Sequence, residues 1–106
     1  MTSRQLRFHA AAREEAEAAI RWYEDRVPGL GSDFATEIER AIAQIEEAPT
    51  SWPASPDDQR ARRLVLSRFP YAVVYLVGPT GDIVVAAIAH GKRQPGYWQE
   101  RLRSEH

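Results

Sequence analysis

The first half of the chain distributes apolar and polar residues with the period of an α-helix. Apolar side chains recur on one face over residues 12–27, and Pro28 ends this segment. A second periodic segment, with a possible cap at Ser32 and Pro49 behind it, predicts a helix over about residues 32–48. Its apolar face consists of Phe34, Ile38, Ala41, Ile42 and Ile45. Because only a few residues connect the two helices, we expect an antiparallel hairpin.

Beyond this hairpin the pattern changes to that of β-strands. Three segments rich in β-branched and aromatic residues, separated by turn-length breaks, are residues 63–66, 71–77 and 83–89. Residues 6–8 alternate as a short edge strand would, and the proline-rich residues 49–60 predict a crossover loop held to the core by Trp52. The predicted fold is α+β in the order β-α-α-β-β-β, with the helical hairpin packed on one face of an antiparallel sheet and the other face thinly covered. We expect one domain over residues 1–106.

The net charge of −1 conceals an uneven distribution. Residues 1–59 carry six basic side chains against twelve acidic ones, whereas residues 60–106 carry eight against three. Lys92 is the only lysine, and arginine favours planar, bidentate contacts with carboxylate or phosphate. The sequence therefore predicts an acidic helical side, an arginine-rich sheet and closing loop, and an anionic partner. We interpret the helix glutamates as solvated faces: Glu14, Glu15, Glu17, Glu46 and Glu47.

Composition excludes several classes of function. The chain has no cysteine, which excludes disulfides, a thiol nucleophile and cysteine-ligated metals, and its three histidines are scattered. We therefore expect neither a metal nor another cofactor. The longest apolar runs, residues 72–77 and 83–89, are far shorter than the roughly 20 residues of a membrane span, and the N-terminus has no signal-peptide core. We expect a cytoplasmic protein.

Candidate functional residues gather around the first predicted β-hairpin and directly after the last strand. They are Arg62, Arg63, Arg68, His90, Lys92, Arg93, Tyr97 and Trp98. Cations stabilise phosphate charge, histidine or tyrosine can move a proton, and aromatic rings can stack on bases. The set suits metal-independent RNA cleavage by 2′-hydroxyl attack, and it equally suits binding of an acidic protein or nucleic acid. Structural explanations compete: a hydrogen bond from backbone to His90, or anchoring of the tail by Trp98.

Four short motifs, taken together in this order, resemble the RelE/ParE family of toxins over residues 6–98. They are Trp22-Tyr23, Glu46-Glu47-Ala48-Pro49, the stretch from Arg68 to Tyr75, and His90-Gly91-Lys92-Arg93. The resemblance implies the growth-inhibiting toxin of a bacterial type II toxin–antitoxin system, of the kind that stabilises plasmids. It also implies a toxin–antitoxin hetero-oligomer, in which a cognate antitoxin wraps an acidic, partly disordered segment around the toxin.

The family divides by target. RelE-like members cut mRNA in the ribosome, and the resemblance places Arg93, Arg63 and Tyr97 or Trp98 at positions of their active residues. If the protein is a nuclease, we expect Arg93 to stabilise phosphate charge and His90 or Tyr97 to handle protons. However, Val65 and Ala72 stand where those nucleases often have basic residues. The interpretation therefore favours a ParE-like toxin that binds DNA gyrase. A third alternative is a non-toxic domain that binds RNA or an acidic peptide.

The predicted contact surface for antitoxin or target follows from the charge distribution and the closing loop. It consists of Arg62, Arg63, Arg68, Lys92, Arg93 and Trp98.

Overall fold

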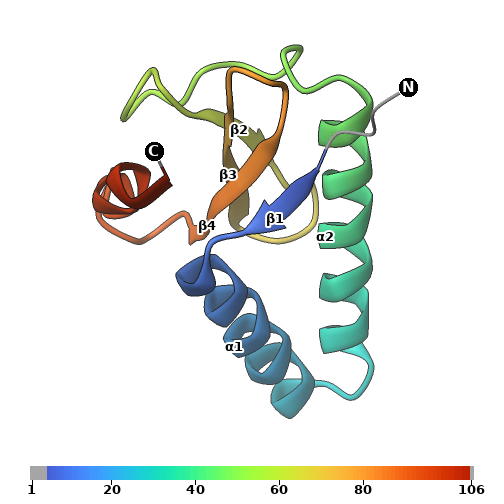
Figure 1. Cartoon of the computed structure of the whole chain (residues 1–106). Coiled ribbons are helices and arrows are strands. Elements are labelled where there is room, and N and C mark those ends of the chain that lie inside the picture. Colours follow the sequence, from blue (N-terminus) through green and yellow to red (C-terminus); the bar gives the residue numbers. More distant parts are fainter. Residues whose placement is uncertain (1–4, 106) are drawn as a thin grey trace.

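The computed structural model describes residues 5–105 and confirms the predicted order of elements. The elements are β1 (Leu6–Phe8), α1 (Ala10–Arg26), α2 (Leu30–Glu47), β2 (Arg62–Val65), β3 (Tyr71–Val77), β4 (Ile83–His90) and the 3₁₀ helix η1 (Gln99–Glu105). In Figure 1 the two long helices form a hairpin beside the sheet, and the C-terminal helix lies apart from them.

The four strands form one mixed sheet in the order β1-β4-β3-β2. The β2–β3 and β3–β4 pairs are antiparallel, but β1 runs parallel to β4, so the expectation of an entirely antiparallel sheet needs this correction. The hairpin and the crossover loop carry the chain to the far edge of the sheet, and the last strand returns beside the first in the same direction. In β4, Val85 and Ala87 pair with consecutive residues of β3, which leaves Ala86 as an extra, bulged residue.

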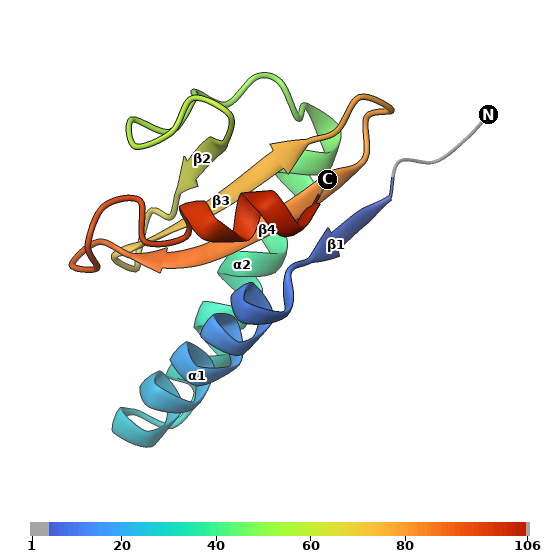
Figure 2. The ribbon, with the colours of Figure 1, turned by 60° about the vertical axis from the view of Figure 1, so that its left-hand side comes forward.

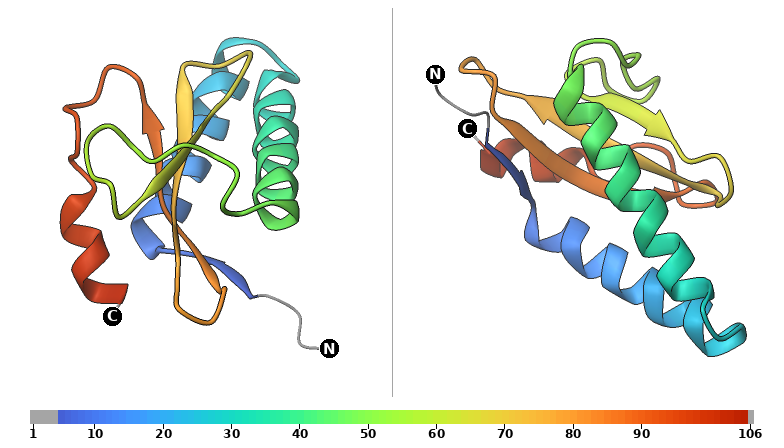
Figure 3. Two further views of the ribbon diagram at one scale, coloured as in Figure 1. Left: turned by 90° about the horizontal axis from the view of Figure 1, so that it is seen from above. Right: turned by 90° about the vertical axis from the view of Figure 1, so that its right-hand side faces the viewer.

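The helical hairpin covers one face of this sheet and builds the main core there (Figure 3). The predicted apolar face of α2 is confirmed, since Phe34, Ile38, Ala41 and Ile45 are all buried. Phe34 packs against a group of aromatic rings from α1, the β2–β3 turn and β3: Tyr23, Phe69 and Tyr71. Trp52 packs partly buried against the same core, as expected.

The junction of the two helices differs from the prediction. Helix α2 begins at Leu30 and not at Ser32, because Gly29 adopts a left-handed conformation with φ of 91° that turns the chain directly into the helix. The Glu24 carboxylate accepts hydrogen bonds from the backbone N–H groups of Gly29 and Gly31, at 2.9 and 3.0 Å. A carboxylate of the preceding helix thus supplies the cap that was expected from a local serine. Val27 lies beyond α1 and is 52% exposed.

The opposite face of the sheet is covered in part by η1, which lies across β3 and β4 (Figure 2). Trp98 and Leu102 are each 2% exposed there. They form a second, smaller core with Ala61, Val74, Ala86 and Ala87. The sheet is therefore enclosed between the hairpin and the C-terminal segment, although the second layer is much smaller.

Candidate functional site

A groove of about 390 Å³ lies on the second face of the sheet, beside η1. Its floor is apolar and is made by Val65, Ala72, Val74 and Ala89, one or two from each of the three antiparallel strands. The loop after β4 forms one wall. Five of the residues predicted from the sequence line it: Arg63, His90, Arg93, Tyr97 and Trp98. Hairpin pairing of β2, β3 and β4 thus brings part of the predicted set together.

Arg93 is the most accessible cation of this groove. It is exposed, and its guanidinium carbon lies 3.9 Å from the centre of the Tyr97 ring. Its backbone N–H donates to the carbonyl of His90 at 3.0 Å, which closes the turn that follows β4. Among residues 5–105, no carboxylate lies within ion-pair distance of Arg93, so its charge is available to an anionic partner.

His90 is partly committed to the backbone. Its Nδ1 accepts a hydrogen bond from the N–H of Lys92 at 3.0 Å, and its ring packs edge-on against Tyr71 with centroids 4.9 Å apart. This is the structural explanation weighed for His90 above, and it fixes the start of the closing loop. Lys92 itself is exposed.

The Tyr97 hydroxyl is engaged by a carboxylate of the helical hairpin. It donates to Oε2 of Glu15 at 2.7 Å. Burial, and after it this hydrogen bond, raise the pKa of Tyr97 far above the ordinary value of a tyrosine. A phenol that holds its proton so firmly is a poor general base. The ring, in contrast, remains available to Arg93.

Glu15 is the centre of a polar cluster that the sequence did not indicate. Besides the hydrogen bond from the Tyr97 hydroxyl, its carboxylate accepts one from the backbone N–H of Ile88 at 3.0 Å. It also accepts one from each terminal nitrogen of Arg101, both at 2.9 Å. The expectation that Glu15 belongs to a solvated face is therefore wrong, because its side chain is only 16% exposed. One signal was present: Glu15 lies one position before Ala16 and four before Ala19, on the edge of the apolar stripe of α1.

Two predicted arginines lie outside the groove, and Trp98 contacts it from inside the protein. Arg62 turns to the crossover loop, where its Nη1 donates to the carbonyl of Trp52 at 2.6 Å. Arg68 lies on the helical side, 3.6 Å from Asp33. Trp98, although it touches the groove, is 2% exposed and belongs to the second core. Alternation along β2 explains the first case, since Arg62 and Arg63 face opposite sides of the sheet.

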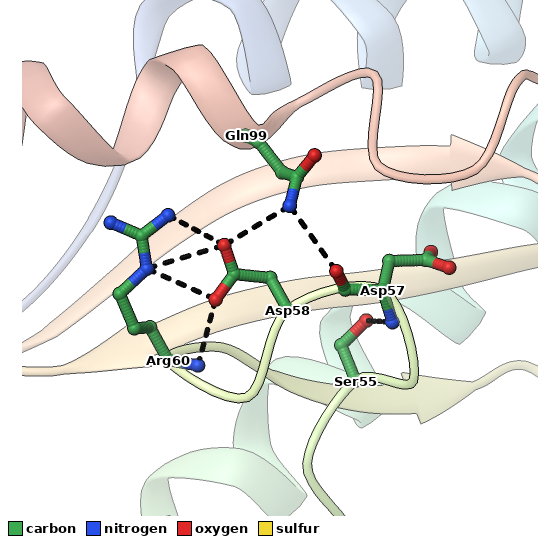
Figure 4. Close-up of polar contacts among 5 residues, drawn as sticks. All are labelled: Ser55, Asp57, Asp58, Arg60 and Gln99. Atoms are coloured by element: carbon green, nitrogen blue, oxygen red, sulfur yellow. Dashed lines mark hydrogen bonds and ion pairs between the residues drawn. The ribbon is translucent and has the colours of Figure 1, made fainter.

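The crossover loop forms a second polar anchor for η1 (Figure 4). Gln99 donates from Nε2 to the carbonyl of Asp57 and to the carboxylate of Asp58, both at 3.2 Å. Asp58 also accepts from the side chain and backbone of Arg60, and these hydrogen bonds hold the pKa of Asp58 well below its ordinary value. Buried Ser55 completes the turn by accepting the N–H of Asp57. The closing loop is thus held between α1 and the crossover loop.

Over residues 5–105, no group of three or more acidic, histidine or cysteine side chains is arranged to bind a metal ion. In the same range, no helix has both the length and the apolar character that crossing a membrane requires.

Comparison with known proteins assigns the family. Residues 6–95 match the family described as ParE toxin of type II toxin-antitoxin system, parDE. The chain belongs to the ParE toxin family. A chain in the structure of the chromosomal ParDE TA system from P. aeruginosa has the same fold as this ParE family member, with a TM-score of 0.72 at 17% identity. That match covers 83% of this chain and 96% of the other. No curated protein sequence matches significantly.

The family assignment confirms the resemblance seen in the sequence and makes the protein a type II toxin. The non-toxic binding domain considered above is not supported by this assignment. At 17% identity, the structural match carries the fold and not the roles of individual residues.

Proposed function

We propose that this ParE family protein inhibits growth by binding DNA gyrase in the cytoplasm. The observation that carries the proposal is the state of Tyr97, whose hydroxyl is held by Glu15 and whose pKa is raised. Together with the apolar side chains of Val65 and Ala72 on the groove floor, it favours a binding surface over a ribonuclease site. The RelE-like alternative would need a group that accepts a proton, and Tyr97 cannot be that group while its hydroxyl donates to Glu15.

The surface that would contact gyrase or antitoxin is the basic rim of the groove. We define it as Arg63 and Arg93, which line the groove, together with the exposed Lys92 that precedes Arg93. Among residues 5–105, none of the three has a carboxylate within ion-pair distance. Arg62 and Arg68 are left out because both are engaged within the protein, and Trp98 because it is buried. An acidic, partly disordered segment of a cognate antitoxin is complementary to this basic rim, and its binding should weaken as salt rises.

The decisive experiment tests gyrase and ribosome-bound mRNA as targets, with the purified protein and with cells in which it is induced. We expect inhibition of gyrase supercoiling, a DNA-damage response on induction, and reversal of both by the antitoxin. Arg93→Ala should raise the inhibitory concentration by about tenfold or more, the effect of losing one charge at an interface centre. Arg40→Ala removes another exposed arginine, from α2, and serves as the matched control. Intact supercoiling together with fragmented mRNA would overturn the gyrase proposal in favour of ribosome-dependent cleavage.

A further inference from the structure

Glu15 occupies the place where the parallel pairing of β1 and β4 ends. The register between these strands stops at Phe8 and Val85, and His9 gives the last backbone hydrogen bond, to the Val85 carbonyl at 2.9 Å. Beyond the bulge at Ala86, the free edge of β4 turns toward α1. There the Ala86 carbonyl accepts from Arg101 at 3.0 Å and the Ile88 N–H donates to Glu15.

The ion pair of Glu15 and Arg101 therefore supplies hydrogen bonds to the part of the β4 edge that lies beyond the short strand β1. Glu15 and Arg101 are 16% and 17% exposed, and their contact is bidentate. Buried peptide groups need such partners, since an unsatisfied group costs about 1–3 kcal/mol. The same carboxylate also receives the Tyr97 hydroxyl, which connects the edge of the sheet to the closing loop.

This connection reaches Arg93. The guanidinium carbons of two arginines lie near the Tyr97 ring, Arg93 at 3.9 Å and Arg101 at 5.1 Å from its centre. The described contacts of Arg93 are its backbone hydrogen bond to His90 and this ring contact, so the ring is what the guanidinium rests on. Fixing the Tyr97 hydroxyl to α1 consequently fixes the platform for the exposed cation.

We propose that Glu15 is a positioning residue, which acts through the Tyr97 hydroxyl to hold Arg93 in the orientation that contacts the target. The inference rests on the proposed function in one respect only, that Arg93 makes that contact. Ordering Arg93 before binding reduces the conformational entropy lost on association, which improves affinity without adding a contact.

The first test is a double-mutant cycle on gyrase inhibition by the full chain. Glu15→Ala and Tyr97→Phe should each raise the inhibitory concentration by roughly tenfold, and neither should add to the effect of Arg93→Ala. Glu15→Gln should recover most of the activity, because the amide oxygen can still accept the Ile88 N–H while the amide NH2 donates to the Tyr97 hydroxyl. Glu14→Ala, an exposed neighbour on α1, should match the wild type. Independent, multiplicative effects of Glu15 and Arg93 would overturn the proposal, and so would full activity of both Glu15→Ala and Tyr97→Phe.

Tyr97→Phe keeps the test valid if Glu15→Ala fails to fold, because it leaves the contacts of Glu15 with Ile88 and Arg101 in place. A second measurement does not depend on gyrase. In NMR spectra, the Arg93 Nε–H signal is assigned by its absence from the spectrum of Arg93→Lys. Relaxation of this signal should report an ordered side chain in the wild type and a mobile one in Tyr97→Phe. An equally mobile Arg93 in both proteins would overturn the positioning role. If the Arg93 side chain is ordered in the wild type and mobile in Tyr97→Phe, but the wild type does not inhibit gyrase, the positioning role is supported and gyrase is rejected as the target.

Discussion

The two faces of the sheet are stabilised by different means. On one face, two long helices bury a continuous core of aliphatic and aromatic side chains around Phe34. On the other, the closing loop and the seven-residue 3₁₀ helix η1 bury Trp98 and Leu102 against small side chains. Polar contacts to Asp58 and Glu15 hold η1 through Gln99 and Arg101. Short 3₁₀ segments have little stability of their own. The hydrophobic face thus maintains the fold, whereas the polar contacts position the candidate site.

The largest expected effect is on the helical face. Phe34 is fully buried and its ring centre lies 5.0 Å from those of both Phe69 and Tyr71. Phe34→Ala should lower the free energy of unfolding by about 3–5 kcal/mol, since it leaves a cavity among rings that cannot close it. Urea denaturation followed by circular dichroism measures the change. Val65→Ala, at a position 62% exposed, is the control and should stay within about 0.5 kcal/mol.

The matching truncation on the other face should cost less. Leu102→Ala removes a buried side chain from the second core and should lower the free energy of unfolding by about 2 kcal/mol, the low end of the range for such changes. A short terminal helix can readjust over the sheet, and the cavity is then partly filled. Hydrogen exchange should show faster opening around Ala86, which Arg101 covers, and unchanged protection in α2. A loss equal to that of Phe34→Ala would refute the proposed difference between the faces.

The sequence predicted the hydrophobic face well because its signals are periodic. The spacing of Phe34, Ile38 and Ile45 specifies one face of α2, and the β-branched residues of β3 and β4 specify the strands, whatever the tertiary detail. The start of the second helix was predicted two residues too late. The start of α2 depends on Glu24, a residue of the preceding helix, and no local pattern indicates such a cap.

The polar contacts of the second face could not be predicted in the same way. Glu15 and Arg101 are far apart in the sequence, and what unites them is the edge of β4 that β1 leaves open after Val85. That edge is visible only once the register and the bulge at Ala86 are known. For the candidate site, Arg63, Arg93 and Tyr97, which the sequence singled out in two separate segments, line one groove in the structure. It did not indicate that the hydroxyl of Tyr97 is already engaged.

A third prediction tests the engagement of Tyr97 through its titration. Because the pKa of Tyr97 is raised in the folded protein, this group contributes stability that is complete below about pH 10 and is lost as pH rises toward the folded value. Tyr97→Phe should therefore lower the free energy of unfolding by about 1 kcal/mol near neutral pH, with a smaller difference above about pH 10. Burial also raises the pKa of Tyr23, Tyr71 and Tyr75, so the ultraviolet titration compares the wild type with Tyr97→Phe. The tyrosine that is missing from the variant should ionise only when the protein unfolds. Ionisation of Tyr97 near its ordinary pKa would contradict the contact with Glu15.

The smallest effect concerns the anchor between the crossover loop and η1. Hydrogen bonds from Arg60, and less so from Gln99, lower the pKa of Asp58. Because the pKa of Asp58 is lower in the folded than in the unfolded protein, its ionised form stabilises the fold at pH values above the unfolded-state pKa of about 3.8. This stabilisation is lost as the pH falls through the pKa of the folded protein. Asp58→Asn should thus be slightly less stable than the wild type at about pH 5, and the difference should shrink on acidification. Asp25→Asn, an exposed aspartate at the end of α1, controls for the change in charge. If the two variants give the same pH profile, Asp58 contributes charge alone, and Glu15 with Arg101 remains the polar anchor that holds η1 to the sheet.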